Sequence, residues 1–111
     1  MTRKGMSEAE RRMYYAEPDV SEVPQLMERW HSSGDWRAAL SARVALTNRC
    51  DDLLSAVDRE SRGLNVAEQR SFDLSADTVR EINAELAEFK RSAIQDLVAR
   101  GIDPAECRLP F

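Results

Sequence analysis

The residues that most often carry chemistry in proteins are few in this sequence and stand far apart. His31 is the only histidine, and the two cysteines are Cys50 and Cys107. A zinc site or a catalytic triad needs several such groups close together, which these three positions do not provide. Cys50 lies on an apolar stripe, where a free cysteine packs as a small hydrophobe, and we expect Cys107 to be a mobile thiol in the tail. The sequence therefore predicts no catalytic, metal-binding or cofactor-binding residue.

Paired carboxylates are the other candidates for chemistry. Two acidic pairs could hold Mg²⁺ or transfer protons: Asp51 with Asp52, and Asp58 with Glu60. Asp51 and Asp58 are seven positions apart on one helical face, but arginines stand beside them, so we expect a solvated face with ion pairs. The sequence has no Gly-rich phosphate loop, Gly-x-Ser-x-Gly elbow or His-Glu-x-x-His pair. These observations predict a protein that is not an enzyme.

Composition narrows the function classes further. The 111 residues include 16 basic and 20 acidic ones, for a net charge of −4. An acidic total disfavours non-specific nucleic-acid binding, which needs a basic surface. No apolar run approaches the ~18–20 residues of a membrane span. The first residues lack the apolar segment of a signal peptide, so we expect a cytoplasmic protein without disulfides.

Two short helices are expected before the main part of the chain. Ser7 and Glu10 have the spacing of a capping box, and the helix that they begin should stop before Pro18. Ser21 can cap a second short helix, which Gly34 would end from the C′ position.

Two long helices should follow. Asp35 is placed to cap a helix from Trp36 to about residue 61, and Gly63 should close it. Its apolar stripe recurs at steps of three and four residues: Ala39, Ala42, Leu46, Cys50, Leu53 and Val57.

The last helix should run from Val66 to about Arg100, with Asn65 and Glu68 as its capping box. Its heptad seam is short, because Ser75 and Asp96 interrupt it at the two ends. The seam consists of Phe72, Val79, Ile82, Leu86, Phe89 and Ala93.

Together these elements predict an all-α fold, an antiparallel, coiled-coil-like hairpin of two long helices preceded by two short N-terminal helices. We expect a short-helix segment at 1–35, the hairpin at 36–101 and a C-terminal tail at 102–111. One narrow seam covers little apolar surface in so small a chain, so we expect a homo-oligomer and a protein interface. The expected interface residues are Leu46, Leu53, Val57, Phe72, Val79, Ile82, Leu86 and Phe89.

The turn between the long helices resembles a known pattern. Residues 60–73 contain Gly63-Leu64-Asn65, then Glu68, then Phe72-Asp73. They are similar to the N-terminal scaffolding (delta) domain of tailed-bacteriophage major capsid precursors, over about residues 40–95. In that family the turn carries Thr where Asn65 stands and two acids where Ala67-Glu68 stand, and a capsid shell domain follows. The resemblance implies a scaffold-like head-assembly protein that binds itself and a phage capsid protein, in the host cytoplasm or a virion precursor.

Two other hypotheses remain open. A small helical inhibitor or adaptor could bind one partner protein through an aromatic N-terminal face and the apolar tail. The possible anchors are Tyr14, Tyr15, Trp30, Trp36 and Phe111. A weaker hypothesis is a regulator that touches DNA through the basic patch of Arg3, Lys4, Arg11 and Arg12.

Overall fold

The computed structural model describes residues 18–109 and 111, and all regular elements in this part of the chain are helical. A 3-10 turn, η2 (Val20–Glu22), leads directly into α2 (Val23–Ser33). The two long helices are α3 (Trp36–Glu60) and α4 (Val66–Ala99), and a second 3-10 turn, η3 (Pro104–Glu106), lies in the tail. The expected helix that starts at Ser7 lies outside the described residues.

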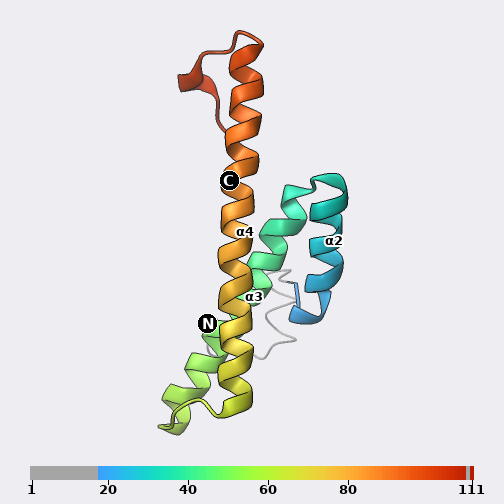
Figure 1. Ribbon diagram of the computed structural model, residues 1–111. Helices are drawn as coiled ribbons and strands as arrows, with labels where there is room; N and C mark the ends of the chain where they lie inside the picture. Colours follow the sequence, from blue (N-terminus) through green and yellow to red (C-terminus); the bar gives the residue numbers. More distant parts are fainter. Residues whose placement is uncertain (1–17, 110) are drawn as a thin grey trace.

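The long helices form the predicted antiparallel hairpin (Figure 1). α4 is the longest element, 34 residues or about 51 Å at 1.5 Å per residue, and it sets the 56 Å length of the molecule. The C-terminal part of α4 extends beyond α2 and α3, and the tail turns back beside it (Figure 1). The radius of gyration is 17.2 Å, against about 13 Å for a compact domain of this length, so the protein is elongated.

The core lies where α2, α3 and α4 meet. The face of α3 that enters it is almost entirely alanine, and Ala39 and Ala42 are fully buried. Small side chains allow the neighbouring helices to approach, and larger ones from those helices fill the space. Leu26 and Trp30 come from α2, Leu46 from the middle of α3, and Ile82 and Leu86 from α4.

Most helix ends follow the capping chemistry expected from the sequence. Gly34 ends α2 in the left-handed conformation at φ 67°, and the side chain of Asp35 accepts a hydrogen bond from Ala38 N. At the start of α4, Asn65 and Glu68 form the predicted reciprocal capping box.

Two of the expected capping residues were wrong, although the helices end within a residue or two of the expected positions. Ser21 does not cap α2, because the capping box belongs to Asp19 and Glu22 and the Ser21 hydroxyl donates to the Asp19 carboxylate at 2.7 Å. The left-handed residue that ends α3 is Ser61 at φ 51°, two positions before Gly63. The Ser61 and Arg62 amides bond back to carbonyls of the last turn, which ends the helix earlier than a search for glycine predicts.

None of the helices in the described part of the chain combines the length and apolar character needed to cross a membrane.

Candidate protein-interaction site

Four aromatic rings meet where the α2–α3 corner approaches the middle of α4. The Trp30 and Phe89 rings make an edge-to-face contact with centroids 5.2 Å apart. Phe111, from the tail, lies 4.9 Å from the Trp36 ring and 6.3 Å from the Phe89 ring. Because Trp30 is only 6% exposed, it is part of the core, whereas Trp36 and Phe111 remain half-buried at the surface.

One carboxylate on α4 ties α2 to the hairpin. Glu85 accepts a hydrogen bond from the indole Nε1 of Trp30 at 3.3 Å and lies 2.7 Å from Nε2 of His31. The indole donor therefore has a partner at the edge of the core, as a largely buried tryptophan requires. His31, the only histidine, thus contributes to the packing of α2 on α4.

The tail is held in place by contacts of its own. Asp103 caps η3, and the Cys107 thiol donates to the main-chain oxygen of Asp103 at 3.4 Å. Cys107 is only 8% exposed, so the expectation of a mobile thiol was wrong. The Lys90 ammonium donates to the main-chain oxygen of Phe111 at 2.9 Å.

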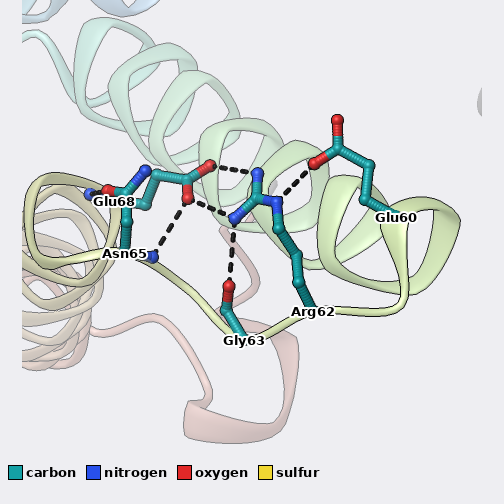
Figure 2. A network of polar contacts seen from close by, with 5 residues as sticks. All are labelled: Glu60, Arg62, Gly63, Asn65 and Glu68. Carbon is teal, nitrogen blue, oxygen red and sulfur yellow. Dashed lines mark hydrogen bonds and ion pairs between the residues drawn. The ribbon is translucent and has the colours of Figure 1, made fainter.

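A polar network fixes the turn between α3 and α4 (Figure 2). The guanidinium of Arg62 makes two hydrogen bonds to the Glu68 carboxylate, at 2.6 and 3.1 Å, and a third to the Glu60 carboxylate. It also donates to the main-chain oxygen of Gly63 at 3.0 Å. Arg62 therefore joins the end of α3, the turn and the start of α4.

This network shifts the protonation equilibria of its members. The hydrogen bonds from Arg62, followed by the one from the Asn65 amide, lower the pKa of Glu68 to about 2. The bonds to Glu68 and Glu60 in turn raise the pKa of Arg62 above its ordinary value. Glu68 is thus an anion over the whole physiological range, which suits its place at a helix N-terminus.

An open, shallow groove lies beside this turn, along the first turns of α4. We call it the turn groove; it is lined by Leu64, Asn65, Val66, Gln69, Arg70, Asp73, Leu74 and Asp77. Val66 is 80% exposed and Leu74 is 62% exposed, the two highest values among the large hydrophobic residues of the described chain. Arg70, Asp73 and Asp77 lie around them. Along α4, Arg70 stands one helical turn from both Val66 and Leu74, so apolar and charged side chains alternate in the turn groove.

The expected interface residues pack mainly inside one chain. Four of them are 6% exposed or less: Leu46, Leu53, Ile82 and Leu86. The other four are half-buried: Val57, Phe72, Val79 and Phe89. Ser75, expected to interrupt the seam, is itself buried at 5% exposure. Asp96, the other expected interruption, is exposed. Whether the half-buried members also contact a second chain stays a prediction.

Among the expected anchors, the structure brings Trp30, Trp36 and Phe111 into one cluster. Tyr14 and Tyr15 lie outside the described residues, as does the basic patch before them. Sequence reasoning missed the turn groove, although Val66 and Leu74 could have been found as apolar residues off the predicted seam.

The structure also describes the surroundings of Cys50, the other cysteine. Cys50 is half-buried, with its Sγ 3.9 Å from the main-chain oxygen of Phe72, and burial raises the pKa of its thiol. A thiol in such surroundings is a poor nucleophile. Within residues 18–109 and 111, no three His, Cys, Asp or Glu side chains gather where they could hold a metal ion.

Comparisons of the chain with protein-family models, with curated proteins and with solved structures find no match.

Proposed function

We propose that this chain is a non-enzymatic, scaffold-like assembly protein that binds a second copy of itself and a capsid-type protein through the outer surface of its helical hairpin. The observation that carries the proposal is the turn groove, where Val66 and Leu74 are 80% and 62% exposed. Large apolar side chains this exposed, interspersed with charged ones in one groove, are typical of a protein-binding surface.

The charges of the turn groove favour a second copy as the occupant. Arg70 and Asp77 are seven positions apart on α4, with Leu74 between them, and both line the groove. If two copies pair with their α4 helices antiparallel about an axis near Leu74, the arginine of each lies opposite the aspartate of the other. Such pairing gives charge complementarity and covers both Leu74 side chains.

The elongated shape also supports assembly. A hairpin with α4 about 51 Å long offers a second copy an extended helical face, as an interface of about 800 Å² per partner needs. The resemblance of residues 60–73 to the delta domain of phage capsid precursors covers this same turn. We infer that the capsid-type partner binds the hairpin and that assembly takes place in the host cytoplasm or a virion precursor.

The adaptor hypothesis has less support from the described residues. It needs exposed aromatic anchors, but Trp30 is 6% exposed and its indole donates to Glu85. A buried side chain with a satisfied donor stabilises the fold and offers little to a partner.

The proposal is tested by the mass of the protein in solution. Sedimentation equilibrium of Leu74→Asp should give a smaller mass than the wild type, because the substitution places a charge in the middle of the apolar contact. Val98→Asp is the matched control, since Val98 is also exposed, at 41%, but lies at the far end of α4. Equal masses for the wild type and Leu74→Asp would contradict self-association through the turn groove.

A further inference from the structure

The C-terminal residue Phe111 occupies a notch that three side chains from two helices form. Trp36 stands at the first position of α3, and Phe89 and Lys90 are neighbours on α4. We call these three residues the aromatic notch. The Phe111 ring lies against both aromatic rings, at 4.9 and 6.3 Å between centroids, and its main-chain oxygen accepts from Lys90 at 2.9 Å.

We propose that the aromatic notch is a docking site for Phe111, held in cis here and open to the same residue of a peptide supplied in trans. This inference does not depend on the proposed assembly function, because the notch and the turn groove lie on different parts of the hairpin.

Two kinds of contact define what the notch recognises. The rings of Trp36 and Phe89 bind an aromatic side chain, and the Lys90 ammonium binds the main-chain oxygen of the same residue. The Phe111 ring is tilted by 36° and 32° to the Trp36 and Phe89 rings, and aromatic pairs at such centroid distances contribute more than their buried area alone. The combination selects an aromatic residue by its ring and fixes the direction of the peptide by its oxygen.

The rest of the fold holds the notch ready for its occupant. Phe89 is braced by the edge-to-face contact with Trp30, a core residue, and lies close to Gly34 at the α2–α3 corner. The guanidinium of Arg37 lies 4.9 Å from the centre of the Trp36 ring, a cation–π distance. Side chains that are already positioned lose little entropy when a ligand binds.

The tail is also shaped to deliver Phe111 to the notch. α4 ends at Ala99, so Phe111 returns along about 15 Å of helix to reach Phe89 (Figure 1). η3, capped by Asp103, and the buried Cys107 form the compact bend that turns the chain back. A segment tethered in this way has an effective concentration of about 1 mM or more at the notch, so the cis segment competes with any segment from outside.

The test uses the full chain with Phe111→Ala, which vacates the ring position and keeps the rest of the tail. The probe is the synthetic peptide Arg-Leu-Pro-Phe, and the matched control peptide is Arg-Leu-Pro-Ala. Binding is followed by NMR shifts of the Trp36 indole during titration to about 5 mM peptide, a range that covers millimolar affinities. A free acid and a C-terminal amide of the probe separate binding of a carboxylate from binding of a carbonyl.

We expect saturable binding of Arg-Leu-Pro-Phe to Phe111→Ala and none of the alanine peptide. Wild-type protein should bind the probe about twofold or more weakly, because an effective concentration of about 1 mM competes with a millimolar affinity. Adding Lys90→Met to Phe111→Ala should weaken binding about tenfold or more, the loss of one hydrogen bond to a charged group. Leu54→Ala, on an exposed position outside both the notch and the turn groove, should leave the affinity unchanged.

Absence of saturable binding to folded Phe111→Ala, or equal binding of the two peptides, would overturn the proposal. If Phe111→Ala does not fold, docking is tested by NMR on the wild-type protein instead. Nuclear Overhauser contacts between the Phe111 and Trp36 rings are expected at a centroid distance of 4.9 Å, and their absence would equally refute docking.

Discussion

Replacing Ile82 with alanine tests the core of the hairpin most sharply. Ile82 lies in the middle of α4, is fully buried, and belongs to the same core cluster as the alanines of α3. The substitution removes three carbons, worth about 2.4 kcal/mol of transfer free energy at ~0.8 kcal/mol each. The alanines around it have no longer side chains to fill the space, so a cavity term raises the expected loss to about 3–4 kcal/mol.

Thermal and urea denaturation followed by circular dichroism measure this loss. At about 4–8 °C for each kcal/mol, the midpoint should fall by about 12 °C or more. Leu54→Ala is the matched control, because Leu54 is 47% exposed, lies outside the turn groove, and its truncation should cost less than about 0.5 kcal/mol.

The same measurement in the Leu74→Asp background separates packing within the chain from packing between copies. The reasoning is refuted if Ile82→Ala costs no more than the control there, since that result places Ile82 in an interface and not in the core of one chain.

Two further predictions concern the turn between the long helices. Ser61→Gly should raise the free energy of unfolding by about 0.5–1 kcal/mol in urea denaturation, since Ser61 has φ 51°, where glycine meets no steric penalty. A lower stability would contradict the left-handed end of α3. Glu68, with its pKa lowered to about 2, stabilises the fold as an anion, and this contribution should be lost as the pH falls from about 4.3, the pKa of an unfolded glutamate, toward 2. The stability difference between wild type and Glu68→Gln should therefore shrink over that range in a pH series, and a difference that stays constant down to pH 2 would count against the network.

The hairpin could be predicted from the sequence because its signals are local. Asp35 as an N-cap, Gly34 as a left-handed stop and the Asn65–Glu68 capping box each act within one helical turn. The period of the apolar stripes then sets which faces of α3 and α4 pack together. These signals fixed the helix boundaries to within a residue or two.

The features that could not be predicted from the sequence depend on contacts between segments that are far apart in the chain or on the geometry of the turn. Ser61 takes the left-handed conformation where its own amide and that of Arg62 bond back to the last turn of α3, although Gly63 is nearby. Cys107 is buried because η3 turns the tail back on α4, a contact between segments with no shared periodicity. The burial of Ala38 and Ala45, off the predicted stripe, follows from α3 having neighbours on two sides.

The candidate site was only partly predictable for the same reason. Trp36 and Phe111 were recognisable as aromatic residues near a turn and at the tail, but their contact joins positions 75 residues apart. Predicting the turn groove requires the positions of Val66 and Leu74 relative to α3, and the spacing of the seam residues alone does not give these positions.

The central claim, assembly through the hairpin, is tested most directly by the solution mass of the wild-type chain. Sedimentation equilibrium should give a multiple of the 12.6 kDa chain mass, with the single-chain mass appearing only on dilution. A mass of 12.6 kDa at every concentration up to the millimolar range would contradict self-association and with it the account of the turn groove.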